Sequence, residues 1–135
     1  MPERLQLSRA KGWRIPPNTL IVSRPNALGN PYRVYQHCKG PDGDWGVEDT
    51  GRLHESIGHG WTRSGAHQMA VDAYRKLLDE VYSPGSTARA ILAMNLSNAD
   101  YLACWCGPDL PCHVDVLLEV ATEWPPFPEP ERTPV

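Results

Sequence analysis

The sequence has no long apolar run and no large excess of either charge. Its apolar stretches fall short of the roughly 18–20 residues that a helix needs to cross a bilayer, and the polar start Met1–Gln6 lacks the apolar core of a signal peptide. We therefore expect a cytoplasmic protein that makes no contact with membranes. In that compartment the four cysteines stay reduced, which argues against a disulfide framework.

The charge balance limits the class of partner. Thirteen Lys and Arg stand against sixteen Asp and Glu, for a formal net charge of -3, whereas a broad surface for duplex nucleic acid needs many phosphate contacts. A small anionic ligand is still allowed, because one or two arginines and a few backbone N–H groups can hold it. The length of 135 residues predicts one domain with one modest core.

Both ends of the chain differ in character from the middle. Residues 1–19 carry Arg4, Arg9, Lys11 and Arg14, which predicts an extended basic arm. Contact with nucleic acid through this arm is a minor alternative, because such clusters are usually only solvated. Residues 125–135 contain five prolines and predict a disordered tail, so that residues 1–124 form a single α/β domain.

Hydrophobic periodicity and turn residues outline the elements between these ends. Short β-branched or alternating runs predict strands, the glycine- and histidine-rich residues 54–61 predict a mobile loop, and apolar residues at helical spacing predict helices. Ser64 is the expected N-cap of the first helix. The predicted elements are a strand at 19–22, a hairpin within 33–48, helices at 64–81 and 88–96, a strand at 101–106 and a helix at 114–124.

The order of these elements predicts a small Rossmann-like fold, in which helices cover a parallel or mixed sheet. In such sheets ligands bind beyond the carboxyl ends of the strands. Two loops, 23–32 and 106–113, directly follow predicted strands. If those strands are parallel, both loops emerge at the same edge of the sheet and form one site.

The segment 104–113 holds three of the four cysteines. Strand residues alternate between faces, so Cys104 and Cys106 are expected to share one face. Cys112 and His113 lie at the expected start of the last helix, where unpaired N–H groups and the helix dipole favour a bound anion or a thiolate of lowered pKa. Asp115, in the first turn of that helix, could orient His113.

Three interpretations of this segment stay open. As a zinc site, it supplies a Cys3His set, although the spacing departs from the usual C-x2-4-C and H-x3-5-H patterns and adjacent ligands usually diverge; the set is Cys104, Cys106, Cys112 and His113. As a site of thiol chemistry, Cys112 is a nucleophile beside His113, with Cys106 or Cys104 as the resolving partner. As structural residues, Cys104 is a small apolar strand residue and His113 caps the helix.

The loop 23–32 offers a second set of candidate ligand-binding residues. Arg24 can clamp a phosphate or a carboxylate, and Gly29 permits close approach of the backbone. Asn30 can read an amide or a base edge, while Tyr32 can stack on a ring. The alternative is a rigid turn with a surface arginine and a core tyrosine.

The remaining candidates are weaker. The pair His37-Cys38 is interpreted as a solvated loop pair, although it could complete a metal site. Trp45 and Trp61 line a pocket or anchor their loop. The other histidines have no regular ligand spacing and are interpreted as surface residues: His54, His59 and His67.

Three segments occur together in one known family. They are Lys11-Gly12-Trp13-Arg14 with Pro17-Asn18, then Arg24 with Gly29-Asn30-Pro31-Tyr32, and then residues 102–106 with Pro111-Cys112-His113-Val114-Asp115. With them, residues 2–124 resemble the bacterial and phage family called Domain of Unknown Function 4326. Two positions depart from the family pattern, because Ala99-Asp100 replaces Gly-Lys and Tyr32 replaces Phe. The resemblance implies a compact α/β fold and a phage or prophage setting, and it names no activity.

These features together lead us to expect a nucleotide- or nucleoside-type ligand between the two loops. Arg24 and the helix N–H groups would hold an anionic group, and Asn30 with an aromatic ring would hold the base. The ligand is either bound or processed, and both alternatives stay open. Two hypotheses from other classes also stay open: a zinc-stabilised module that binds nucleic acid or protein, and a thiol-dependent enzyme.

Overall fold

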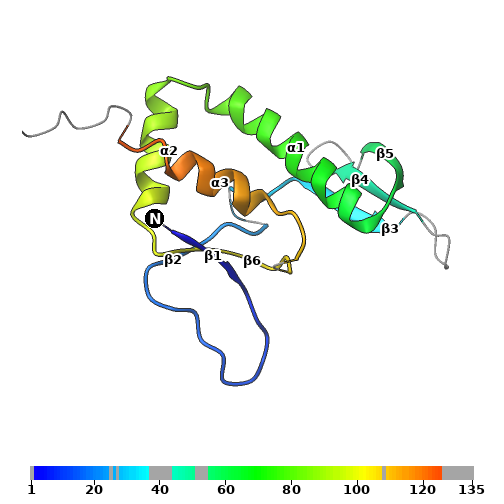
Figure 1. Cartoon of the computed structure of the whole chain (residues 1–135), viewed down its shortest axis with the longest axis horizontal. Helices are drawn as coiled ribbons and strands as arrows, with labels where there is room; N and C mark the ends of the chain where they lie inside the picture. Colours follow the sequence, from blue (N-terminus) through cyan, green and yellow to red (C-terminus); the bar gives the residue numbers. More distant parts are fainter. Residues whose placement is uncertain are drawn as a thin grey trace, which may run out of the picture.

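The computed structural model of the chain describes residues 2–24, 26, 28–36, 44–50, 55–107 and 109–125. In this part of the chain, three short strands make a parallel sheet in the order β1-β6-β2 (Figure 1), with β1 at Glu3–Gln6, β2 at Thr19–Ile21 and β6 at Tyr101–Cys104. Arg4 and Leu20 lie opposite Leu102 on its two sides. The parallel pairing of β2 with β6 brings the loops that follow them to one edge of the sheet, as expected.

A second, antiparallel sheet has the order β3-β4-β5, with β3 at Tyr32–Gln36, β4 at Trp45–Asp49 and β5 at Glu55–Trp61. The predicted hairpin is the β3–β4 pair. The prediction of a mobile loop is wrong for residues 55–61, because β5 pairs with β4 and sets Trp61 opposite Trp45. The register shifts opposite Val47, where Gly58 has a φ of 153°. This irregularity interrupts the alternation of apolar and polar residues by which a strand is recognised in a sequence.

All three predicted helices are present, with α1 at Arg63–Val81, α2 at Thr87–Ser97 and α3 at His113–Ala121. Thr62, not Ser64, caps α1, since its hydroxyl oxygen accepts the N–H of Gly65 at 3.0 Å. Ser86 caps α2 in the same way, and Cys112 is the N-cap residue of α3. No helix in the described ranges combines the length and the apolar character needed to cross a bilayer.

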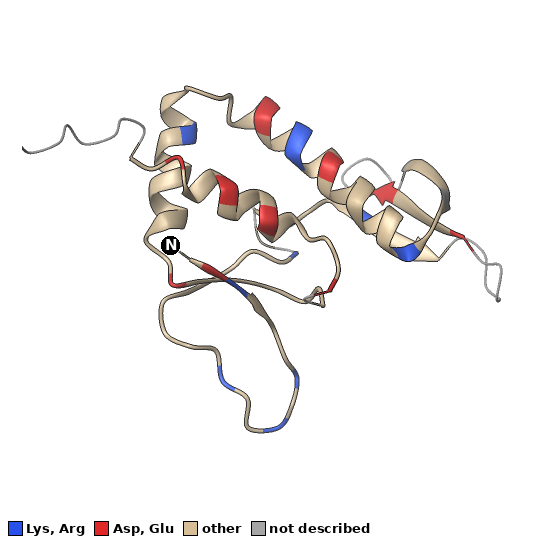
Figure 2. Cartoon of the chain, in the orientation of Figure 1, with Lys and Arg blue, Asp and Glu red and all other residues tan. Residues whose placement is uncertain are grey.

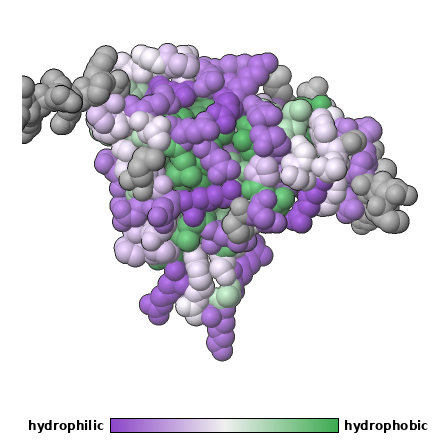
Figure 3. Space-filling view, viewed as in Figure 1, coloured by the Kyte–Doolittle hydropathy of each residue, from purple (hydrophilic) through white to green (hydrophobic). Residues whose placement is uncertain are grey.

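Helix α1 joins two hydrophobic clusters. On one side, Val71 and Leu78 pack into the main core with side chains from α2, α3 and β6. On the other side, Ala66 and Ala70 pack against Val47 of the antiparallel sheet. Figure 3 shows apolar side chains between the helices of one face, surrounded by hydrophilic residues. Helix α1 therefore holds the antiparallel sheet beside the carboxyl ends of the parallel strands.

The N-terminal segment is an arm only in part. Its first residues form β1, and the buried Leu7 donates its N–H to the carbonyl of Cys104 at 2.8 Å. Residues 8–18 then make a long loop that carries basic positions and no acidic ones (Figure 2). The loop ends at Asn18, whose left-handed φ of 55° is tolerated by asparagine, and whose side-chain amide donates to the carbonyl of Asn98. Residues 126–135 of the predicted tail lie outside the described residues.

Candidate functional site

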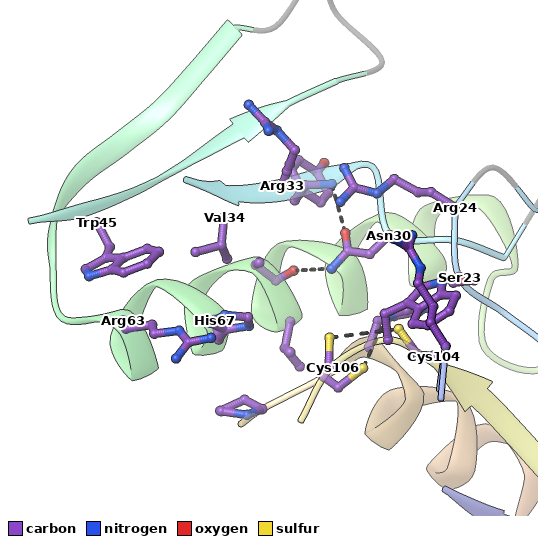
Figure 4. A pocket seen from close by; sticks show the side chains of 18 residues that line it. Ser23, Arg24, Asn30, Arg33, Val34, Trp45, Arg63, His67, Cys104 and Cys106 are labelled. Carbon is purple, nitrogen blue, oxygen red and sulfur yellow. Dashed lines mark hydrogen bonds between the residues drawn. The ribbon is translucent and has the colours of Figure 1, made fainter. Parts of the chain in front are cut away.

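A pocket of about 560 Å³ opens beyond the carboxyl ends of β2 and β6. Ser23 and Arg24 line it after β2, and Cys104 and Cys106 line it at the end of β6. Side chains from β3, β4 and α1 close its far side, so that in Figure 4 the labelled residues surround one opening. The structure thus brings the two predicted loops together around a single pocket.

The three cysteines of the turn converge in the wall of this pocket. The Sγ atoms of Cys104, Cys106 and Cys112 all lie within 4.8 Å of one another, and those of Cys104 and Cys106 are 3.8 Å apart. All three are free thiols. Strand β6 ends at Cys104, so Cys106 meets it through the bend that follows rather than through strand alternation as predicted. The cluster could hold a soft metal ion.

Ionisation of this cluster is shared among the thiols. Hydrogen bonds from Cys106 and Cys112 lower the pKa of Cys104, because they stabilise a thiolate there. The same bonds to Cys104 raise the pKa of Cys106 and of Cys112. One negative charge, centred on Cys104, is therefore easier to form than two. Cys112, the predicted nucleophile, is only 2% exposed, whereas Cys106 is partly accessible.

His113 is buried beside the cluster, and its ring is fixed from two sides. Its Nε2 lies 2.7 Å from the carbonyl of Val22, and its ring packs edge-on against Tyr74 with centroids 5.1 Å apart. In the neutral ring, that bond places the proton on Nε2 and leaves Nδ1 as an acceptor for the thiol of Cys112. Nδ1 lies 3.6 Å from Sγ of Cys112. The carbonyl of Val22, rather than Asp115, orients this histidine.

Asp115 lies beside the turn rather than in the pocket lining. Its carboxylate accepts the N–H of Cys112 at 3.3 Å and pairs with Arg4 at 3.3 Å. Arg4 also donates to the carbonyls of Gly107 at 2.6 Å and Leu110 at 2.9 Å. The carboxylate of Asp115 therefore caps the start of its own helix, α3, and Arg4 of β1 holds the turn before it. The sequence pattern gave no local signal for this contact, because its partners are more than 100 residues apart.

The pocket has a strongly basic lining. Of its eighteen described lining residues, none is Asp or Glu, although the whole chain carries a formal charge of -3. The four lining arginines are Arg9, Arg24, Arg33 and Arg63. Arg33 is partly neutralised, since its guanidinium lies 2.6 Å from a carboxylate oxygen of Glu48 on β4. The other three arginines have no carboxylate partner among the described residues.

Two of these arginines lie against tryptophan rings, which limits where their charges can move. Arg9 lies 4.9 Å from the ring centroid of Trp105, and Arg63 lies 5.6 Å from that of Trp45. His67, predicted to be a surface residue, is half-buried in the pocket wall, where burial and then the charge of Arg63 lower its pKa. Sequence reasoning missed Arg9, Arg33, Arg63 and His67 as site residues, because only tertiary packing places their elements at this edge.

The loop after β2 uses part of its polar groups to hold its own shape. A Cβ at Gly29 would lie 2.8–2.9 Å from backbone atoms of Arg24 and Asn26, so this position needs glycine. Asn30 donates its amide to the carbonyl of Ala70 and accepts the N–H of Tyr32, at 3.2 and 2.9 Å. Arg24, Asn30 and Tyr32 line the pocket, while Gly29 shapes the loop behind it. Asn30 therefore anchors the loop to α1.

The family model described as Domain of unknown function (DUF4326) matches residues 5–123. The chain belongs to this family. The match covers the second half of β1, both loops of the pocket and α3, so every residue that lines the pocket lies within the DUF4326 domain. No curated protein and no solved structure matches the chain.

The remaining candidates lie apart from this DUF4326 site or outside the description. His59 pairs with Asp44, with Nδ1 3.0 Å from a carboxylate oxygen, and Trp61 belongs to β5. The pair His37-Cys38 and His54 lie outside the described residues. The site that the structure assembles therefore has two chemically different parts, a thiol cluster with a fixed histidine and a basic wall with aromatic rings.

Proposed function

We propose that this protein binds a small anionic ligand of the nucleotide or nucleoside type in the pocket between the two loops. The observation that carries the proposal is the charge of the lining, which has four arginines and no acid among its described residues in an acidic chain. Arg33 is paired with Glu48, but the other three guanidinium groups repel each other around one opening, and a bound phosphate or carboxylate would offset that repulsion.

The size and composition of the pocket support a nucleotide-sized ligand. Its volume of about 560 Å³ falls within the range of roughly 300–1,000 Å³ that is usual for small-molecule sites. Trp45, Trp105 and Tyr32 supply aromatic rings to the lining, and a base would stack on Tyr32 or replace the arginine that lies over a tryptophan. Arg24, which is exposed and lines the pocket beside Ser23, is the residue that we expect to hold the anionic group.

The place of the pocket in the fold also supports the proposal. Rossmann-like sheets bind their ligands beyond the carboxyl ends of parallel strands, and we infer that β1-β6-β2 is a small sheet of this kind. Because Asp115 caps α3, the arginines rather than the helix N–H groups would carry most of the anion binding. In the cytoplasm of a phage-infected or prophage-bearing cell, such a site would capture a nucleotide signal or process it.

Thermal stabilisation and calorimetry with a panel of nucleotides test the proposal. The panel contains nucleoside mono-, di- and triphosphates, cyclic nucleotides and dinucleotides. For a ligand that binds, Arg24→Ala should weaken affinity about ten- to a hundred-fold, because a charge-assisted hydrogen bond contributes about 1.5–3 kcal/mol. Arg14→Ala is the matched control, since Arg14 is an exposed arginine of the 8–18 loop and lies outside the pocket lining.

Two results would count against this function. The first is the absence of stabilisation by every nucleotide of the panel in the unmodified protein. The second is an equal loss of affinity in Arg24→Ala and Arg14→Ala, which would indicate a general charge effect instead of a site. Chromatography of the ligand recovered after incubation separates binding from turnover, because a processed ligand no longer elutes with the starting compound.

A further inference from the structure

The three thiols have the spacing of a tetrahedral metal site. With zinc–sulfur bonds of about 2.3 Å, tetrahedral angles place two coordinating sulfurs roughly 3.8 Å apart. The Sγ atoms of Cys104 and Cys106 are 3.8 Å apart, and Cys112 lies within 4.8 Å of both. A shift of less than about 1 Å in one side chain brings all three to coordinating distance. Simple apolar packing of cysteines requires no such convergence.

His113 offers a fourth donor beside Cys112, at the distance expected between two ligands of one ion. A zinc–nitrogen bond of about 2.0–2.1 Å beside a zinc–sulfur bond of about 2.3 Å places the two donor atoms roughly 3.6 Å apart. Nδ1 of His113 lies 3.6 Å from Sγ of Cys112. These neighbours converge because Cys112 is an extended N-cap, with φ −143° and ψ 149°, while His113 already belongs to the helix. The two neighbouring donors can therefore face the same point, and the ring of His113 must still move to complete the set, because only the three sulfurs already lie within 4.8 Å of one another.

The surroundings of His113 are those of a metal-binding histidine. Histidines that bind zinc usually donate their other ring N–H to a carbonyl or carboxylate, which fixes the tautomer and the ring. Here Nε2 lies 2.7 Å from the carbonyl of Val22, in a ring that is 4% exposed and packed on Tyr74. The pocket gives an entry path, because all four donor residues belong to its lining.

We propose that Cys104, Cys106, Cys112 and Nδ1 of His113 bind one zinc ion. Thiolate and imidazole donors select zinc over the hard cations that prefer oxygen. Three thiolates and one Zn²⁺ leave a formal charge of −1, and the guanidinium of Arg4, which is shared with Asp115, contacts the same turn through the carbonyls of Gly107 and Leu110. The metal would join the end of β6 to the start of α3, and this role does not depend on the ligand in the pocket.

Metal content of the unmodified protein is the first test. The full chain is purified under reducing conditions without chelator and analysed for metals, with about one zinc per chain expected. Replacement of the zinc by Co²⁺ should produce the thiolate-to-cobalt charge-transfer band and the intense visible bands of a tetrahedral site. Both measurements use the intact protein, so a variant that fails to fold does not affect them.

Variants assign the ligands. Cys112→Ser and His113→Gln should each weaken zinc binding by more than a hundred-fold in a chelator competition, because a donor is lost. Cys38→Ser makes the same chemical change at the remaining cysteine of the sequence, which lies outside the described residues, and should leave zinc affinity unchanged.

Each of three outcomes would overturn the proposal. One is the absence of zinc together with the absence of a tetrahedral cobalt spectrum in the reduced, intact protein. Another is wild-type zinc affinity in Cys112→Ser. The third is loss of zinc in Cys38→Ser with retention in His113→Gln, which would give the fourth position to Cys38. None of these measurements includes a nucleotide, so they fail or succeed independently of the proposed ligand site.

Discussion

Replacement of Arg4 should strongly destabilise the protein, because this side chain connects β1 to a distant turn. The side chain is 18% exposed and donates to the carbonyls of Gly107 and Leu110, and it also pairs with Asp115. It thereby connects β1 to the turn that carries the cysteines and to Asp115 in the first turn of α3. We expect Arg4→Ala to loosen that turn as well as lower the free energy of unfolding.

The size of the effect follows from these contacts. A hydrogen bond from a charged donor contributes about 1.5–3 kcal/mol, and the lower figure suits a side chain that water can partly reach. Two such bonds give about 3 kcal/mol. The pair with Asp115 adds about 0–1 kcal/mol, because that carboxylate is 46% exposed. A loss of about 3 kcal/mol corresponds to a fall in Tm of roughly 10–15 °C for a domain of this size.

Urea unfolding followed by tryptophan fluorescence measures this change, since the chain has five tryptophans. Arg4→Lys should recover about half of the loss, because an ammonium reaches one carbonyl rather than two. Arg14→Ala, an exposed arginine of the neighbouring loop, should change the free energy of unfolding by less than about 0.5 kcal/mol. If Arg4→Ala is as stable as Arg14→Ala, the contacts assigned to Arg4 do not hold the turn.

Two further predictions concern the loop and the pocket wall. Gly29→Ala should cost about 1–3 kcal/mol, because the new Cβ would lie within 2.9 Å of backbone atoms of Arg24. Gly107→Ala should cost much less in the same urea unfolding, since its close neighbour is a side chain that can rotate. For His67, burial and Arg63 lower the pKa, so the unfolded chain binds its proton at a higher pH than the folded chain. Stability should therefore fall as the pH drops below about 6.5, and His67→Gln should show a smaller fall; equal pH profiles would refute this.

Local pattern predicted those elements whose own residues fix their structure. The three helices follow from apolar spacing and turn residues, and the parallel pairing of β2 with β6 follows from the order of strands and helices. Strand β1 was not predicted, because Glu3–Gln6 has little β propensity and forms only by pairing with β6. Strand β6 stops where pairing on both sides runs out, since Ile21 ends β2 opposite Ala103 and Gln6 ends β1 opposite Cys104.

The candidate site divides in the same way. Its location was predicted, since Arg24 and the cysteine turn each follow a strand of the parallel sheet. The basic wall was not, because Arg33 and Arg63 come from β3 and the start of α1, and nothing in the local pattern shows that α1 brings the second sheet to this edge. A pattern reveals what a residue can do, whereas packing across elements decides which residues face each other.

The zinc proposal constrains how the proposed ligand would lie in the pocket. A zinc ion with three thiolates and a histidine has a formal charge of −1, and Cys106 belongs to the pocket lining. An anionic group would therefore be repelled from the cysteine wall and attracted toward Arg24 and Arg63, so that the uncharged part of the ligand faces the metal site. Removal of the metal breaks the link between the end of β6 and the start of α3, so the cysteine wall against which the uncharged part of the ligand lies loses its fixed shape. If both proposals hold, chelation at constant pH should weaken the orientation of the ligand, visible as reduced discrimination between nucleotides that share a phosphate but differ in base.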